Sequence, residues 1–480
     1  MTDPLSFPER LSQLAIDFPH SPAVTDFDGT YTFAELWQQA TTLAQHYQQA
    51  GVGFGDIVSV ALPSNRTFVV ASAAAWILGA TPQPLSSKVA KPELQAILEL
   101  SNSALVVGID DNFGIPTLAS ISGLDPLSEE PLPFVTSEAW KAPVSGGSTG
   151  RPKVIVATTP AIVPSVAPLA GMVRVAEGDT LLMTAPLHHN GPFLFSTVGL
   201  MAGAHVVLMD RFDAERSLQL IQDHHVTWTY MVPTMMSRIS KLPDDTRQSY
   251  DVSSLHTLFH LAAPCPVWLK RLWIEWLGPD VIWELYAGTE AQAATVINGT
   301  QWLAHEGSVG PVVIGEMKIL GPEGEALPAG TIGEVWMRST SGPTYRYMGA
   351  EAKRNAEGWE SLGDLGYMDE DGFLYLCDRL ADMVIVGGAN VYPAEVEAVL
   401  EEHPSVIGAI VIGLPDDDMG KRLHALVNLS TPITDEELSE WCSSRLSRHK
   451  TPRSFERVDT PLRDDAAKVR RQALTSERSG

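Results

Sequence analysis

The stretch VSGGSTGRPKV, residues 144–154, gathers three glycines, two serines and a threonine just before Pro152 and Lys153. Glycine, serine and threonine let successive backbone N–H groups point inward and cradle an anion, and the hydroxyls add further donors. The Walker pattern is not met, because Lys153 follows Pro152 and precedes Val154 instead of a serine or threonine. The stretch therefore predicts a phosphate-binding loop of another kind, with a flexible surface turn as the alternative.

The overall composition limits what else the protein can bind. Its 480 residues predict two domains, one of them large. Lys and Arg total 33 against 58 Asp and Glu, which gives a net charge of −25 at pH 7. So acidic a chain argues against nucleic acid or an anionic membrane as a partner.

Cysteine spacing and hydropathy indicate the compartment. The three cysteines, Cys265, Cys377 and Cys442, lie far apart without C-x-x-C spacing, so neither a disulfide framework nor a zinc site is expected. The first residues lack the basic start and apolar run of a signal peptide. The longest mostly apolar run, 68–80, is too short to span a bilayer. We expect a cytoplasmic protein.

Short apolar runs alternate with helix-like segments over most of the chain. Strands are predicted at 56–62, 180–187 and 204–210, a helix at about 68–78, and a helix N-cap at Asp213. Repeated strand–helix units indicate a mostly parallel sheet covered on both faces. After about residue 300, alternating strands around a Gly-Pro-Glu-Gly turn predict an antiparallel, barrel-like piece, and a small α+β unit follows.

Four further motifs follow the glycine-rich stretch in chain order. They are PLHHNGPF (186–193), YAGTEA (286–291), LGDLGYMDEDGFLYLCDRLADMVIVGGANVYPAEVEAVL (362–400) and LRDDAAKVRRQAL (462–474). Together with SGGSTGRPK they resemble the motif set of the adenylate-forming superfamily, which holds acyl-CoA synthetases, peptide-synthetase adenylation domains and luciferases. The resemblance covers residues 10–475.

This resemblance implies an α/β fold in two domains. The large N-terminal domain, residues 1–380, would hold two doubly wound sheets and a small β-barrel. A small, mobile α+β domain, residues 381–480, would close over it as a lid, with the active site in the cleft between them. Ala381 stands at the hinge position, where relatives often have Lys or Asp, and Ala467 stands where they usually have Gly. The rotation of the small domain about this hinge is therefore open to differences from the relatives.

The resemblance also implies the first reaction and its cofactors, ATP and Mg²⁺. A carboxylate attacks the α-phosphate of ATP and expels pyrophosphate, with Lys468, His189, Thr289 and Glu290 as the catalytic residues and Glu290 as the metal ligand. From the residues alone, Asp364 could be a turn residue, Glu290 a helix-start acid and Lys468 a lysine of a solvated basic tail. The implied ATP-binding residues are Ser148, Thr149, Gly150, Lys153, Ala262, Ala263, Tyr286, Asp364 and Arg379.

The acid substrate is expected beside the PLHHNGPF motif. His188 and His189 could form half of a metal site, yet no third ligand presents itself, and the resemblance assigns His189 to the carboxylate pocket. The candidates form a mostly apolar set that suits a cyclic or aromatic acid. They are His189, Phe193, Phe195, Trp228, Met231, Ala262, Ala287 and Gly288.

Two acceptors fit the second reaction. The stretch GGANVYPAEVE, 387–397, resembles the loop that lines the pantetheine tunnel of acid–CoA ligases, which favours the thiol of CoA. The chain as a whole is similar to the branch of bile-acid–CoA ligases and stand-alone amide ligases of the coronafacic acid ligase type. We predict an amide ligase that uses the amine of an amino acid, with an acid–CoA ligase as the alternative and no carrier domain in this chain. A nucleotide-binding regulator without catalysis is disfavoured, because Glu290, Asp364, Arg379 and Lys468 are all present.

Overall fold

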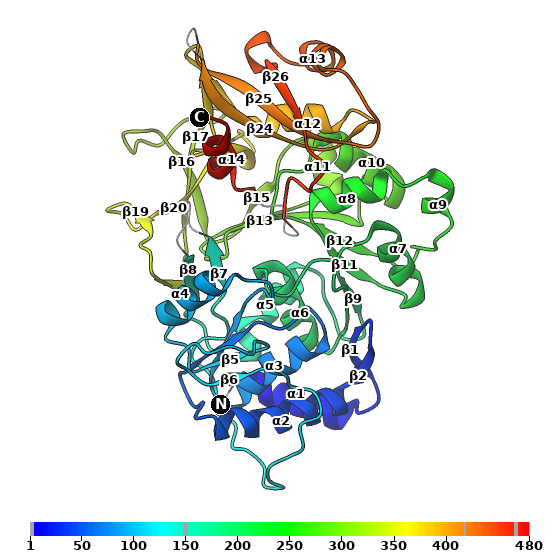
Figure 1. The fold of residues 1–480 in the computed structure, drawn as a ribbon, viewed down its shortest axis with the longest axis vertical. Helices are drawn as coiled ribbons and strands as arrows, with labels where there is room; N and C mark the ends of the chain where they lie inside the picture. The colour runs from blue at the N-terminus through cyan, green and yellow to red at the C-terminus, as the bar shows by residue number, and fades with distance from the viewer. Residues whose placement is uncertain (1–3, 147–151, 417–418, 465–468, 480) are drawn as a thin grey trace.

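The computed structural model describes residues 4–146, 152–416, 419–464 and 469–479. Most of the chain forms a large N-terminal domain, and the orange and red end of the chain forms a small domain packed on one end of it (Figure 1). The predicted α/β class with a large and a small domain is confirmed. None of the helices in the described ranges combines the length and apolarity that crossing a bilayer requires.

A four-stranded parallel sheet lies in the N-terminal part of the large domain. In spatial order it holds β4 (Thr81–Pro84), β3 (Ile57–Val60), β5 (Leu105–Val107) and β6 (Thr117–Leu118). Helix α3 (Arg66–Ile77) contacts β3 and β4 of this sheet and β1 of the next, and every residue from Phe68 to Ile77 is buried. A helix between two sheets needs an apolar surface all round, which explains the run of Val and Ala. The strand predicted at 56–62 and the helix predicted at 68–78 are confirmed.

The second sheet is larger and begins with a parallel half. In spatial order this half holds β13 (Ile282–Ala287), β12 (Thr257–His260), β11 (Trp228–Met231), β9 (Thr180–Met183), β10 (His205–Leu208) and β1 (Pro22–Asp26), with β2 (Gly29–Thr32) antiparallel at the edge. The strands predicted at 180–187 and 204–210 are β9 and β10. Asp213 is the predicted N-cap, and its side chain accepts the backbone N–H of Arg216 at 2.8 Å.

The antiparallel unit predicted after residue 300 is continuous with this sheet. Strand β14 joins the two, because it pairs with β13 on one side and β15 on the other. The unit holds β14 (Ala294–Asn298), β15 (Gly310–Ile314), β21 (Phe373–Arg379), β20 (Glu360–Met368), β17 (Gly333–Arg338) and β16 (Glu316–Leu320), with β19 (Lys353–Arg354) paired to β20. A separate small sheet holds β18 (Tyr345–Met348), β8 (Pro152–Ala157) and β7 (Val144–Gly146).

Helices cover the faces of these sheets, as strands buried on both sides require. Beside α3 they are α1 (Phe7–Asp17), α2 (Phe33–Gln49), α4 (Lys91–Ser101), α5 (Ala167–Met172), α6 (Asn190–Ala202), α7 (Ala214–Asp223), α8 (Pro233–Ser240), α9 (Asp244–Gln248), α10 (Val267–Leu277) and α11 (Gly299–Ala304).

The small domain has its own apolar core between α12 and a three-stranded sheet. Its elements are β22 (Val384–Val386), β23 (Ala389–Val391), α12 (Pro393–Glu401), β24 (Val406–Asp416), β25 (Gly420–Leu429), α13 (Asp435–Ser443), β26 (Ser454–Arg457) and α14 (Arg471–Arg478). A hydrogen bond from Lys241, after α8, to the backbone oxygen of Val406 ties it to the large domain.

Candidate active site

The parallel strands bring most of the predicted site residues to one edge of the large sheet. Strands β9, β11, β12 and β13 run parallel, so the segments that leave their carboxyl ends share that edge. His189 follows β9 as the N-cap of α6, residues 261–264 follow β12, and residues 286–290 end β13. Ligands of open α/β sheets bind at this edge, so the topology itself supports a site there.

Glu290 is the centre of the most tightly bonded cluster at this edge. Glu290 is only 5% exposed, and its Oε1 accepts hydrogen bonds from the Tyr347 hydroxyl at 2.5 Å and from the Lys153 ammonium at 3.2 Å. Lys153 also donates to the Tyr347 oxygen at 2.9 Å. Burial and the hydrogen bond to Glu290 raise the pKa of Tyr347 well above its usual value, so the phenol stays protonated and keeps donating. Lys153 and Glu290, each predicted separately as a site residue, are thus in contact, while Tyr347 was not predicted.

Glycine at position 288 is what allows the chain to pass this carboxylate. A Cβ added to Gly288 would lie 2.4 Å from Leu362 Cδ1 and 2.9 Å from Glu290 Oε2. Glu290 Oε2 therefore faces the chain turn, while Oε1 carries the two donors. One buried carboxylate fits Mg²⁺, which is usually held through one or two carboxylates and completes its shell with substrate phosphates and water.

Asp364, Arg379 and Tyr286 form a second cluster. The Tyr286 hydroxyl donates to Asp364 Oδ2 at 2.7 Å, and Arg379 Nε lies 3.4 Å from Asp364 Oδ1. Asp364 and Arg379 are direct partners in the pairing of β20 with β21, which holds the two side chains on one face. Burial and Asp364 raise the pKa of Tyr286 well above its usual value. Three predicted ATP-binding residues are therefore in contact.

The loop after β12 supplies short side chains at the same edge. Ala262 has φ +75°, in the left-handed region that alanine rarely adopts, and it is exposed, as is Ala287. Such strained positions cost about 1–3 kcal/mol and are concentrated at functional sites. Ala263 follows, half-buried and packed against the core. Thr289 is half-buried between Gly288 and Glu290.

Four predicted acid-pocket residues have buried side chains that belong to the apolar core. Trp228 and Phe195 are fully buried and pack on each other with ring centroids 5.2 Å apart, and the Trp228 indole N–H donates to the Val173 carbonyl. Met231 is fully buried, and the Phe193 ring packs between Trp76 and Trp140. Strands buried on both faces are apolar throughout, so apolarity could not tell a side chain facing the site from one facing a helix.

Other predicted residues have different outcomes. Ser148, Thr149, Gly150 and Lys468 lie outside the described residues. Ala381 is exposed in the connection to the small domain, where the next residue, Asp382, lies 3.3 Å from Arg471 Nε. The rings of His188 and His189 are half-buried and 4.1 Å apart.

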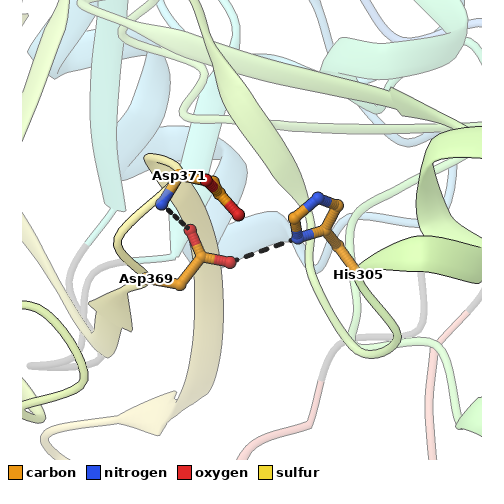
Figure 2. A group of neighbouring side chains, drawn as sticks. All are labelled: His305, Asp369 and Asp371. Carbon is orange, nitrogen blue, oxygen red and sulfur yellow. Dashed lines mark hydrogen bonds and ion pairs between the residues drawn. The ribbon is translucent and has the colours of Figure 1, made fainter.

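A group of side chains able to bind metal lies at the turn between β20 and β21. Figure 2 shows His305, Asp369 and Asp371 facing one another. Asp369 accepts the backbone N–H groups of Asp371 at 3.0 Å and Phe373 at 2.8 Å, and it lies 3.2 Å from His305 Nδ1. The His305 ring stacks on Phe373 at 3.5 Å. These contacts explain why the three side chains lie together, because they stabilise the turn between β20 and β21.

Comparison with known proteins identifies the family. The family profile described as AMP-binding enzyme matches residues 12–347, and the one described as AMP-binding enzyme C-terminal domain matches residues 395–464. The chain belongs to this family of AMP-binding, adenylate-forming enzymes. It is an ATP-dependent acid ligase that works through an acyl adenylate.

Relatives of known activity match over nearly the whole chain. A 2-succinylbenzoate–CoA ligase of Bacillus licheniformis is 32% identical, over 98% of this chain and 100% of the ligase. A feruloyl-CoA synthase of an Amycolatopsis species is 31% identical, over 95% of this chain and 94% of the synthase.

Solved structures agree with this assignment. The o-succinylbenzoate CoA synthetase of Bacillus subtilis, in complex with its acyl-adenylate intermediate, is 28% identical with a TM-score of 0.83 over 98% of both chains. The same protein has been solved with ATP and a magnesium ion. The amide bond synthetase McbA of Marinactinospora thermotolerans is 24% identical with a TM-score of 0.81, over 98% of this chain and 99% of McbA, and it shares the fold.

Proposed function

We propose that the protein activates an aromatic carboxylic acid with ATP and transfers the acyl group to the thiol of CoA. The observation that carries this proposal is that relatives above 30% identity, aligned over at least 94% of both chains, are a 2-succinylbenzoate–CoA ligase and feruloyl-CoA synthases, whose names specify acyl-CoA products of aromatic acids. The amide-forming reaction that we first expected has weaker support, because McbA is similar at a level that shows the fold alone. The alternative, acid–CoA ligase, thus becomes the main proposal.

Glu290 and Lys153 are proposed to act on the phosphates of ATP. Glu290 would hold Mg²⁺, which neutralises phosphate charge and polarises the bonds to phosphorus when bound. Lys153 is already 3.2 Å from Glu290 and would add a cation on the same side. Thr289, the residue before Glu290, would donate a hydrogen bond from its hydroxyl to the α-phosphate. The acid oxygen then attacks the α-phosphorus and pyrophosphate leaves.

Asp364, Arg379 and Tyr286 are proposed to bind the nucleoside. Asp364 already holds the Tyr286 hydroxyl and the Arg379 guanidinium, so its orientation is fixed before ATP arrives. A carboxylate accepts hydrogen bonds only, which suits the two hydroxyls of a ribose. Ala262 and Ala263 would flank the adenine, and their short side chains leave its faces accessible.

The remaining roles are proposed on resemblance. Ser148, Thr149 and Gly150 would cradle the β- and γ-phosphates, and Lys468 would stabilise charge on the α-phosphate. His189 would border the acid, together with Ala287 and Gly288. The domains would divide at residue 380, with Ala381 as the hinge.

The products of a single incubation test the acceptor. The protein is incubated with ATP, Mg²⁺, CoA and isoleucine, and with benzoate, ferulate, anthranilate or 2-succinylbenzoate as the acid. We expect an acid-dependent acyl-CoA, AMP and pyrophosphate in the mass spectrum. A dominant amide, with CoA unchanged, would restore the amide-ligase assignment, and acid-dependent ADP would contradict both.

Asp364→Asn tests the nucleoside site. The amide still accepts the Tyr286 hydroxyl, and Arg379 is largely exposed, so the fold should hold. The lost charge weakens the bonds to the ribose hydroxyls, and we expect the KM for ATP to rise about 10- to 100-fold, since a hydrogen bond to a charged group is worth about 1.5–3 kcal/mol. Asp110→Asn, at an exposed position after β5, is the matched control. An unchanged KM for ATP would remove Asp364 from the nucleoside site.

A further inference from the structure

Two consecutive residues, Trp140 and Lys141, dock on the first turn of α6. The Lys141 ammonium donates to Asn190 Oδ1 at 2.5 Å. The Trp140 ring stacks on Phe193 with centroids 6.2 Å apart and planes inclined by 10°. Asn190 and Phe193 are three positions apart, so both point from the same face of the helix. This contact fixes the turn that starts at the N-cap His189.

Lys141 is an unusual residue for such a place. It is 7% exposed, and its ammonium lies 4.6 Å from the centre of the Trp140 ring. Burial lowers the pKa of its amine to about 7, against the attraction of Glu290. Within the described ranges the ammonium contacts an amide oxygen and an aromatic face, and its hydrogen bond goes to the amide and not to a carboxylate. A buried charge without a bonded counter-ion is costly, and such groups are concentrated at functional sites.

The contact determines which way the Asn190 amide points. An ammonium has three donors and no acceptor, so only the amide oxygen can face it. The NH₂ group of Asn190 is therefore turned away from Lys141, and the residue is half-buried. The next residue, Gly191, lies against Tyr230 of β11, because an added Cβ would be 3.1 Å from that ring. Asn190 thus starts α6 at the sheet edge where the candidate site lies.

Resting on the proposed function, we propose that Lys141 is a positioning residue for the acid substrate. It holds the Asn190 carbonyl, so that the Asn190 NH₂ group donates to the carboxylate of the acid before adenylation. The first N–H groups of α6 add partial positive charge beside it. A neutral amine could accept a hydrogen bond from the amide and let it flip. Only the protonated lysine fixes the donor toward the substrate.

Steady-state kinetics of Lys141→Met, Asn190→Ala and the double variant test this role. The acid is whichever of the four above wild type turns over fastest. We expect each single variant to raise the KM for the acid about 10- to 100-fold, as loss of a charge-assisted donor does. The KM for ATP should not change. The double variant should be no worse than Asn190→Ala, because Lys141 acts through Asn190. Lys91→Met, on an exposed lysine, is the control.

A pH profile separates positioning from a merely structural role. Within the described ranges, the charged group that acts on Lys141 is Glu290, from the turn after β13, and this carboxylate also accepts the Lys153 ammonium and the neutral Tyr347 hydroxyl. In wild type the KM for the acid should rise as pH passes about 7, where Lys141 loses its proton, and in Lys141→Met this rise should be absent.

The variant Asn190→Asp separates the loss of the N–H donors from a folding defect. The carboxylate keeps the Lys141 contact but removes the N–H donors, so we expect a urea midpoint no lower than that of wild type and the largest rise in the KM for the acid. Additive effects in the double variant, or an unchanged KM for the acid in folded Lys141→Met, would overturn the proposal. If wild type releases no pyrophosphate with any of the four acids, the proposed function fails first and this inference falls with it.

Discussion

Replacing Glu290 by glutamine is expected to lower the rate of acyl-adenylate formation by at least about 10³-fold, because metal ions supply several kcal/mol of charge stabilisation and each 1.36 kcal/mol is tenfold. Glutamine has the same size and still accepts the Tyr347 hydroxyl, so the buried position should stay filled. What is lost is the negative charge that would hold Mg²⁺ and that pairs with Lys153. The rate is read as acid-dependent pyrophosphate release.

The Mg²⁺ dependence makes this prediction specific. In Glu290→Gln the Mg²⁺ concentration for half-maximal rate should rise, while the KM for the acid should change little. Glu316→Gln, which breaks the half-exposed pair with Arg338, makes the same chemical change away from the cluster and should leave both quantities unchanged. If Glu290→Gln kept the wild-type rate at limiting Mg²⁺, the metal would be held elsewhere.

The parallel half of the fold and the location of the site followed from the sequence. Short apolar strands between helical segments predicted β3, β9 and β10, and parallel strands end at one edge. The family resemblance assigned His189, Ala262 and Glu290 to one site, and the structure brings the segments that hold them to that edge. Two separate motifs assigned Lys153 to ATP binding and Glu290 to the metal, and the structure brings these residues, 137 positions apart, into contact.

The composition of the acid pocket stays a prediction. Phe195 and Trp228 resemble pocket residues in sequence, yet each is fully buried in contacts with the other and with the core. In a helix or strand covered on all sides every position is apolar, so no period marks the face that a ligand meets. The short residues Ala262 and Ala287, which are exposed, were predictable only through the family resemblance.

Two single residues were missed for a different reason. Tyr347 lies in β18, and the pairing of β18 with β8 brings it into contact with Lys153. A single tyrosine in the stretch TYRYMG carries no sequence signal for such a role. Lys141 stands alone between Trp140 and Ala142, and a single lysine in a sequence is expected to be a solvated one. Only its contacts in the folded structure identify each of these two residues as part of the site.

A buried ion pair beneath the same edge of the sheet leads to the second large effect. Lys270 of α10 is fully buried, and its ammonium donates to Glu284 of β13 at 2.6 Å. Glu284 is 5% exposed and precedes Tyr286 by two positions. Burial raises the pKa of Glu284 despite the attraction of Lys270. The neighbouring His260 cannot replace the cation, because burial lowers its pKa well below the usual value and keeps the ring neutral.

Lys270→Met is therefore expected to reduce the free energy of unfolding by about 3–5 kcal/mol, the usual cost of leaving one partner of a buried pair unpaired. The sign of the pH effect follows from Glu284. Without Lys270 its pKa in the folded protein lies further above the unfolded value, so the loss is full above the folded pKa and shrinks as pH falls toward the unfolded one. Urea unfolding at about pH 8 and about pH 5 should show the larger loss of stability, relative to wild type, at the higher pH.

The double variant Lys270→Met with Glu284→Gln is the control for this explanation. It removes the unpaired charge and should recover much of the stability. If the double variant were as unstable as Lys270→Met at both pH values, lost packing around Lys270 and Trp302, and not the unpaired carboxylate, would be the cause.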